Sequence, residues 1–187
     1  MTTDAPGQSA QLFLCVAGVL DQLRVPYAAI GAMAAAYFGV VRASLDADAV
    51  ISLAGSATTM DDLLAALRGE GLSVTVRLGD ESDPLAGVIA VEDGYANRVD
   101  LILGIRGMDS AAFSRTIPAP LLGTPIRMIG IEDFIAMKIF AGGPRDTDDV
   151  RGVLQVSRAA IDLELTKQLT ARYGPNELGI LERLLSE

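Results

Sequence analysis

The sequence predicts an α/β (α+β) fold, in which a small mixed β-sheet is flanked by helices and followed by a helical C-terminal third. Strand-like segments are dense between residues 72 and 103, whereas the apolar residues from 131 onward recur at helical spacing. Half of the 187 residues are apolar, which is enough for one well-buried core. We therefore expect a single domain, 1–187, with a core at 25–129 and a helical part at 130–187 packed on it.

The first elements are expected to alternate between helix and strand. Apolar residues at helical spacing predict a helix over 10–24, which Val25-Pro26 ends because proline cannot continue a helix. A short buried strand over 27–30 then leads through Gly31 to an Ala-rich helix over 32–38. The next strand, 47–53, is followed by a helix that Thr58 or Thr59 can cap.

The later elements are set by turn residues and by apolar spacing. Three strands are expected between the turns of the middle region, and a short edge segment after the interruptions at Pro118 and Pro120. Four helices follow, punctuated by Gly142-Gly143-Pro144 and by Gly174-Pro175. These strands are at 72–78, 87–92, 98–103 and 124–129, and these helices are at 131–141, 146–157, 163–173 and 176–185.

Composition excludes several classes of chemistry. The chain has no histidine, which removes Ser-His-Asp and Cys-His catalysis and His-ligated zinc. Its net charge of −9 argues against broad nonspecific binding of nucleic acid, so a small anionic substrate is expected to arrive with a metal ion. No apolar stretch approaches about 18 residues, and the N-terminus lacks basic residues. We therefore expect neither a membrane span nor a signal peptide, and a cytoplasmic location.

Three acids are the candidate metal ligands. Asp46 and Asp48 stand two residues apart at the start of an apolar strand, so their side chains project from the same face. Asp100 opens a second apolar run and can supply a third carboxylate. With twenty-four acids in the chain, the same alternation is also consistent with a solvent-facing strand edge. Carboxylates beside a buried run repel each other unless a cation or protons compensate them, and a shared divalent ion would do so.

Gly31 is the candidate phosphate-binding turn. A strand that runs into glycine and then a helix leaves backbone N–H groups free to bind an anion. Arg42 and Ser44 lie between Gly31 and Asp46, near enough in sequence to face the same cleft. The alternatives are a simple tight turn at Gly31 and ordinary loop surface at Arg42 and Ser44.

Lys138 is a candidate for neutralising phosphate charge. It lies in a helix whose other faces are strongly apolar, where it can equally extend from a packed helix to solvent. The run from Asp146 to Asp149 is typical of a helix cap, with Asp149 completing a capping box. The two roles are compatible, because a cap can also orient a lysine.

These motifs together resemble the nucleotidyltransferase superfamily, specifically the small bacterial branch related to the AbiEii toxin and the minimal nucleotidyltransferases. The matching segments are 30–32, 41–48, 98–102, 132–138 and 145–150, within about residues 25–155. The resemblance implies that Asp46, Asp48 and Asp100 hold metal ions and that the Gly31 turn meets the nucleotide phosphates. It also implies that Lys138 and Asp146 line the site.

The sequence departs from the family pattern near these motifs. Ala32 stands where the family usually has Gly or Ser, which leaves only backbone contact to phosphate. Ala47 and Ala49 replace larger aliphatic residues, and Ser44 stands where Thr is common. These departures point to an altered pocket or to a decayed enzyme.

The resemblance implies a metal-dependent transfer of a nucleoside monophosphate from a nucleoside triphosphate such as ATP to an acceptor hydroxyl on RNA, protein or a small molecule. Asp46 and Asp48 would bridge two Mg²⁺ (or Mn²⁺) ions about 4 Å apart, and Asp100 would accept the acceptor's proton. The expected nucleotide-binding residues are Gly31, Ala32, Arg42, Ser44, Lys138 and Asp146.

Two other readings remain open. One is a non-catalytic relative that binds nucleotide or a partner protein, such as one half of a toxin–antitoxin pair with an antitoxin-type partner. The other is an enzyme specific for an antibiotic-like small molecule, which the low lysine content and negative charge fit better than they fit tRNA.

Overall fold

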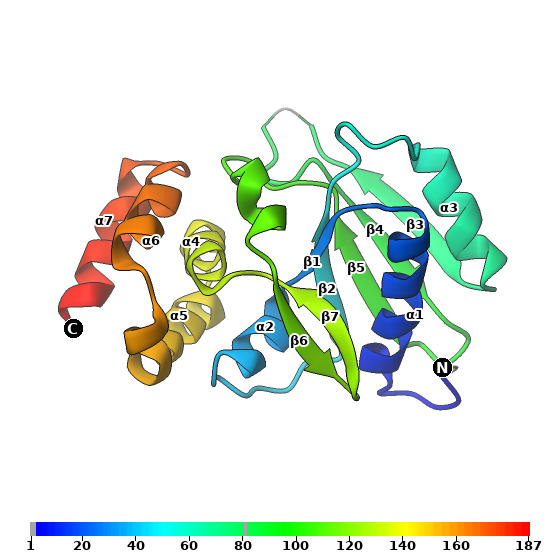
Figure 1. Cartoon of the computed structure of the whole chain (residues 1–187), viewed down its shortest axis with the longest axis horizontal. Helices are drawn as coiled ribbons and strands as arrows, with labels where there is room; N and C mark the ends of the chain where they lie inside the picture. The colour runs from blue at the N-terminus through cyan, green and yellow to red at the C-terminus, as the bar shows by residue number, and fades with distance from the viewer. Residues whose placement is uncertain (1–2, 81) are drawn as a thin grey trace.

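A single mixed sheet of seven strands forms the centre of the molecule, in the order β3-β4-β5-β2-β1-β7-β6 (Figure 1). The computed structural model describes residues 3–80 and 82–187. The β1–β7 and β2–β5 pairs are parallel, and the other neighbouring pairs are antiparallel. The strands are β1 (Tyr27–Ala29), β2 (Asp46–Ile51), β3 (Ser73–Leu78), β4 (Gly87–Glu92), β5 (Arg98–Ile102), β6 (Ile117–Leu121) and β7 (Thr124–Met128).

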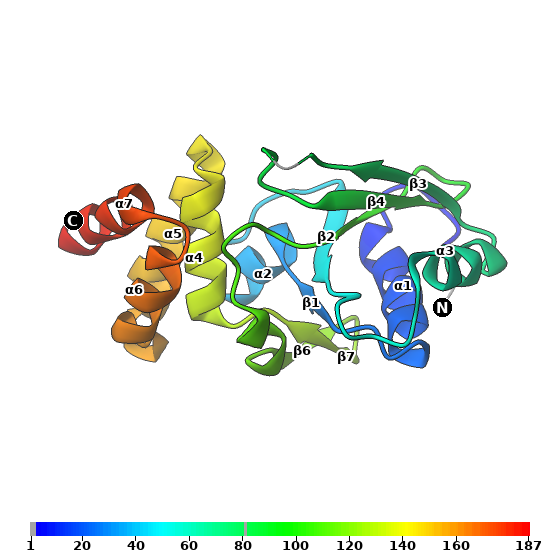
Figure 2. The same ribbon diagram turned by 90° about the horizontal axis from the view of Figure 1, so that it is seen from above.

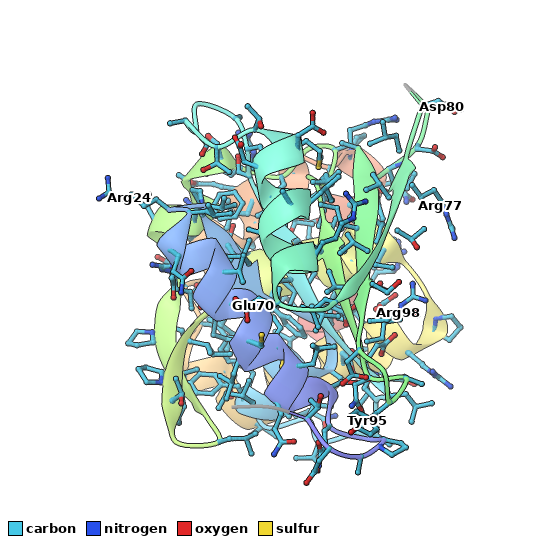
Figure 3. All side chains as sticks on the ribbon, turned by 90° about the vertical axis from the view of Figure 1, so that its right-hand side faces the viewer. Arg24, Glu70, Arg77, Asp80, Tyr95 and Arg98 are labelled. Carbon is cyan, nitrogen blue, oxygen red and sulfur yellow. The ribbon has the colours of Figure 1, made fainter. Side chains whose placement is uncertain are left out.

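Helices lie on both sides of this sheet. Two of them cover one face (Figures 2 and 3), and the others lie on the opposite side, where the C-terminal helices pack on one another (Figure 2). The first pair is α1 (Ser9–Gln22) and α3 (Met60–Gly69), and the others are α2 (Gly31–Tyr37), α4 (Ile131–Ala141), α5 (Pro144–Ser157), α6 (Leu163–Ala171) and α7 (Pro175–Ser186). Within the described residues, no helix is long and apolar enough to cross a membrane.

The predicted fold class is confirmed, and the predicted elements are present with ends that differ by a few residues. The α3 helix begins as expected, since Thr59 and Asp62 form a reciprocal capping box at its N-terminus. The prediction of an edge segment at 124–129 is wrong, because β7 lies between β1 and β6.

The edge strand at this end of the sheet is β6, where the prolines predict an interruption instead. Pro118 and Pro120 are exposed on this strand, whereas Ala119 between them is buried. Proline has no N–H group to donate to a neighbouring strand. It is therefore tolerated on an edge strand, which pairs with a neighbour on one side only. An edge position therefore accommodates both prolines.

The alternation along β2 and β5 places the acids. Ala47 and Ala49 on β2, and Val99 and Leu101 on β5, are at most 3% exposed, and α1 packs on both strands. Because successive side chains point to opposite faces, Asp46, Asp48 and Asp100 project to the side where α2 lies.

Candidate metal and nucleotide site

Three carboxylates meet on the side of the sheet opposite α1. Asp48 on β2 is directly paired in register with Asp100 on the parallel neighbour β5, and Asp46 lies two residues earlier on the same face. One carboxylate oxygen from each residue lies within 4.8 Å of the other two. The structure therefore brings together the three acids that the sequence singled out, with a spacing that suits a shared cation.

Gly31 is held against this cluster. The backbone N–H of Ile30 donates to the Asp48 carbonyl at 2.9 Å, which fixes the start of α2 beside β2. Gly31 has φ +64°, and a Cβ atom at this position would lie 2.1 Å from Asp48 Oδ2. Glycine is required here both by the left-handed backbone and by the close approach of a carboxylate. The tight turn and the candidate site are thus the same feature.

Asp48 is the most perturbed of the three acids. Burial, followed by the charges of Asp46 and Asp100, raises its pKa to about 6. Lys138 and Arg42 act in the opposite direction and lower it. Asp48 is difficult to ionise because it lies beside two other carboxylates. A divalent cation bound among the three would stabilise the ionised form of Asp48 and take the place of its proton.

Two side chains orient the outer carboxylates. Ser44 Oγ donates to Asp46 Oδ1 at 2.7 Å, and Arg98 Nε donates to Asp100 Oδ1 at 2.9 Å. Arg98 was not among the predicted site residues. Its position two residues before Asp100 on the same strand was the available signal, because that spacing puts both side chains on one face.

Lys138 and Arg42 converge on a buried acid. Lys138 Nζ lies 2.6 Å from Asp146 Oδ1 and 2.8 Å from Asp149 Oδ2, and Arg42 Nε lies 3.1 Å from Asp149 Oδ1. The side chain of Lys138 is 12% exposed, so it does not extend to solvent. Both cations are close enough to Asp48 to affect its pKa.

The capping role expected of Asp149 is wrong. The α5 helix begins at Pro144, and Asp146 caps it by accepting from the Gly143 N–H at 3.2 Å. Asp149 lies within the helix, is 2% exposed, and binds the two cations instead. The expectation that a capping acid also orients the lysine holds for Asp146, which does both.

A pocket of about 350 Å³ opens beside the acid cluster, between β5 and α4. Gly31, Lys138 and Asp146 line it together with apolar side chains that include Ile102, Phe134 and Met137. Ala32 lies next to Gly31 in the first turn of α2 and is 8% exposed, so its methyl group belongs to the core. A ligand in this pocket therefore meets no side chain at Ala32.

The donor set fits a hard divalent cation. Mg²⁺ and Mn²⁺ prefer oxygen ligands, and the cluster offers carboxylates alone. Soft or histidine-dependent metals have no matching ligands here, because the chain lacks histidine and Cys15 lies on α1, on the far side of the sheet.

No protein-family model matches this sequence, and no curated protein matches it. Solved structures do resemble its fold. The antibiotic-resistance factor ANT(2'')-Ia in solution has a TM-score of 0.62 at 15% identity, covering 94% of this chain and 96% of that one. A crystal structure of ANT(2'')-Ia in complex with adenylyl-2''-tobramycin has a TM-score of 0.61 at 16% identity, covering 89% and 97%.

A third similar structure is an antigenic nucleotidyltransferase-like protein from Paracoccidioides brasiliensis. Its TM-score is 0.51 at 14% identity, covering 98% of this chain and 95% of that one. Identities this low establish a shared fold alone, and the resemblance to the AbiEii branch stays a prediction. The chain has the fold of the nucleotidyltransferases.

Proposed function

We propose that this protein transfers a nucleoside monophosphate from a nucleoside triphosphate to an acceptor hydroxyl, with Mg²⁺ or Mn²⁺ held by Asp46, Asp48 and Asp100. The observation that carries the proposal is the meeting of these three carboxylates within 4.8 Å, with the central one raised in pKa to about 6. The shared fold supports the same reaction class.

In this reaction the acceptor oxygen bonds to the α-phosphorus, and the bond from that phosphorus to the bridging oxygen breaks. Pyrophosphate leaves with the electron pair, and the acceptor proton passes to Asp100. A bound divalent ion would lower the pKa of the acceptor hydroxyl and offset the charge that develops on the leaving group. Ser44 and Arg98 hold the outer carboxylates in place through their hydrogen bonds.

The nucleotide is assigned to the 350 Å³ pocket beside the acids. The backbone at Gly31 and Ala32 faces the phosphates, and Lys138 and Arg42 offset their charge, with Asp146 and Asp149 positioning the two cations. The apolar side chains of the pocket, including Phe134, are suited to the base.

The test is incubation with each α-labelled triphosphate, Mg²⁺ and either total RNA or a panel of hydroxylated small molecules. We expect labelled product and released pyrophosphate with the wild-type protein, and loss of both in Asp46→Asn and Asp48→Asn. Asp148→Asn is the matched control, because its side chain is 77% exposed on α5 and lies outside the cluster. Wild-type rates in either cluster variant would refute the metal assignment.

A second candidate is a non-catalytic protein that binds nucleotide or a partner, such as the toxin or antitoxin of a pair. Two observations favour it. Lys138 and Arg42 already form ion pairs with Asp146 and Asp149, so their charges are compensated without a nucleotide. Ala32 also lacks the hydroxyl that a serine would offer to phosphate. Thermal stabilisation by ATP and Mg²⁺, without pyrophosphate release on any acceptor, would favour it. Both candidates are consistent with the cytoplasmic location expected from the sequence.

A further inference from the structure

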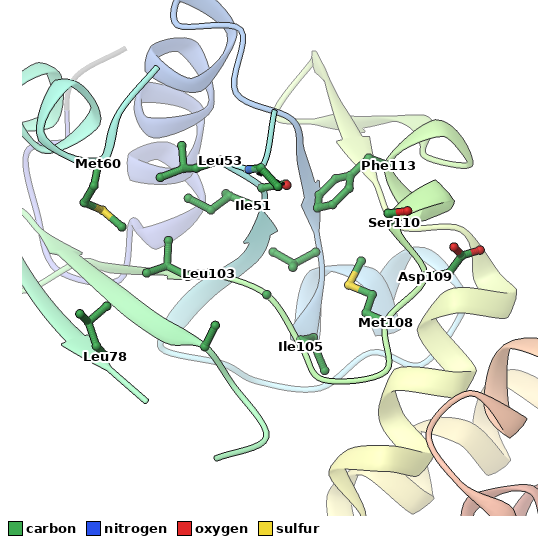
Figure 4. A pocket seen from close by; sticks show the side chains of 15 residues that line it. Ile51, Leu53, Met60, Leu78, Leu103, Ile105, Met108, Asp109, Ser110 and Phe113 are labelled. Carbon is green, nitrogen blue, oxygen red and sulfur yellow. Dashed lines mark hydrogen bonds between the residues drawn. The ribbon is translucent and has the colours of Figure 1, made fainter. Parts of the chain in front are cut away.

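A second cavity, of about 480 Å³, lies at the carboxyl ends of β2 and β5. Figure 4 shows its side chains converging from the strand ends, from the start of α3 and from the segment that precedes β6. Its walls are mainly apolar, with Leu53, Met60, Leu103, Ile105, Met108 and Phe113 among them. This volume is within the range of pockets that bind small molecules.

The cavity lies at the end of the strand that carries Asp46 and Asp48. Val50 lines it on the face of the acids, whereas Ile51 and Met60 line it on the face that α1 and α3 cover. Val50 stands two residues after Asp48 on β2, which places the two Cα atoms roughly 7 Å apart along the strand.

Ile102, the register partner of Val50 on β5, lines the other pocket, the one assigned to the nucleotide. Ile105 lines both pockets, and it forms a β-bridge with Leu85, which lines the nucleotide pocket.

The two pockets differ in charge. The nucleotide pocket contains Lys138 and Asp146, whereas Asp109 is the sole ionisable side chain among the described residues that line the second cavity. Asp109 is already bound by Arg115, at 3.0 Å. The second cavity therefore offers neither the acidic surface that a polycation needs nor a cation for an anionic ligand.

We propose that this second cavity binds the body of the acceptor, and that the acceptor is a neutral, largely apolar small-molecule alcohol. The proposal rests on the nucleotidyl transfer proposed above and names the substrate class for the same site. An apolar body seated against Phe113 and Met108 gains free energy from burial, while its hydroxyl reaches along β2 toward Asp48 and Asp100. Polycationic aminoglycosides and RNA are not expected to bind there.

The methionines provide built-in reporters for the experiment. Met60 and Met108 line the second cavity, Met137 lines the nucleotide pocket, and Met128 is buried in the sheet away from both. In protein labelled with ¹³C at the methionine methyl groups, geraniol serves as the neutral apolar alcohol and kanamycin as the polycation. We expect geraniol to shift the Met60 and Met108 signals and kanamycin to shift neither.

Two matched variants localise the binding. Ala86→Phe places a large side chain in the second cavity, and Ala141→Phe does the same in the nucleotide pocket. Both residues are exposed, so neither change disturbs the core. We expect Ala86→Phe to remove the geraniol shifts and Ala141→Phe to retain them. Geraniol shifts confined to Met137, shifts that survive Ala86→Phe, or the absence of any shift would overturn the proposal.

The proposal and the proposed function can fail separately. The methyl shifts require no nucleotide and no turnover, so they test the cavity alone. Transfer of label from ATP to geraniol supports both claims. Transfer to RNA or kanamycin in preference to apolar alcohols would overturn the acceptor class and leave nucleotidyl transfer standing. Geraniol binding at Met60 and Met108 without transfer to any acceptor would overturn the proposed function and the acceptor role of the cavity.

Discussion

The cluster of acids should destabilise the protein when no metal ion is present, and Asp48→Asn should remove that penalty. The pKa of Asp48 is raised from 3.8 to about 6 by burial and by Asp46 and Asp100. A carboxyl whose pKa is higher in the folded state stabilises the fold at low pH, and this contribution is lost as the pH rises through about 6. The difference between the two pKa values corresponds to about 3 kcal/mol, at 1.36 kcal/mol per pKa unit.

Asparagine has nearly the shape of aspartate and fits beside Gly31, but it carries no charge. In EDTA at pH 8, we therefore expect Asp48→Asn to unfold with a free energy up to about 3 kcal/mol higher than that of the wild type, or roughly 6–12 °C in Tm for a chain of this size. At pH 4 the difference should shrink to about 0.5 kcal/mol, because Asp48 is then protonated in the folded wild type.

The assay is urea unfolding at both pH values, followed by circular dichroism. Asp148→Asn is the control, since its exposed side chain should leave the unfolding free energy unchanged at either pH. Saturating Mg²⁺ should narrow the gap at pH 8 by stabilising the wild type alone. A variant no more stable than the wild type at pH 8, or equally stabilised at both pH values, would refute the reasoning.

Further predictions concern the groups around the cluster. Gly31→Ala should lower the unfolding free energy by at least about 1 kcal/mol and weaken Mg²⁺ binding, because the added Cβ would meet Asp48 Oδ2. Urea unfolding curves and calorimetric Mg²⁺ titration check these two effects. An unchanged Mg²⁺ affinity would contradict the prediction. Asp149→Asn should lower the unfolding free energy by about 3 kcal/mol, because Arg42 loses its partner and Lys138 keeps Asp146 alone. Urea unfolding of Asp149→Asn and Asp146→Asn measures this. If Asp149→Asn lowers the unfolding free energy no more than Asp146→Asn does, the prediction is wrong.

Sequence patterns predict best the elements whose ends are marked by glycine. The α4 helix is buried on most of its surface and has the predicted limits because Gly130 and Gly142 bound its apolar run. The β4 strand has them because its alternating burial begins at Gly87 and ends shortly before Gly94.

β6 was missed because its prolines usually interrupt strands, and only the sheet order makes it an edge. The direct pairing of Asp48 with Asp100 also follows from the sheet order, because it requires β5 to lie beside β2.

The site was only partly predictable for a similar reason. An acid such as Asp149 in a helix is usually exposed, and nothing local marks it as buried. Its burial depends on Lys138 and Arg42, which come from two other segments of the chain. The spacing of Arg98 and Asp100 on one predicted strand places both side chains on one face, but it does not tell an ion pair from two separate side chains. Local spacing identifies candidate ligands, whereas tertiary pairing decides which charges neutralise one another.

The most direct test of the metal site is a Mn²⁺ titration followed by electron paramagnetic resonance at pH 8. The wild type is expected to bind Mn²⁺ in competition with Mg²⁺, and Asp148→Asn should bind it equally well. Asp46→Asn, Asp48→Asn and Asp100→Asn should each weaken binding at least about tenfold. Undiminished Mn²⁺ affinity in Asp48→Asn would contradict the assignment of these three carboxylates as a metal site.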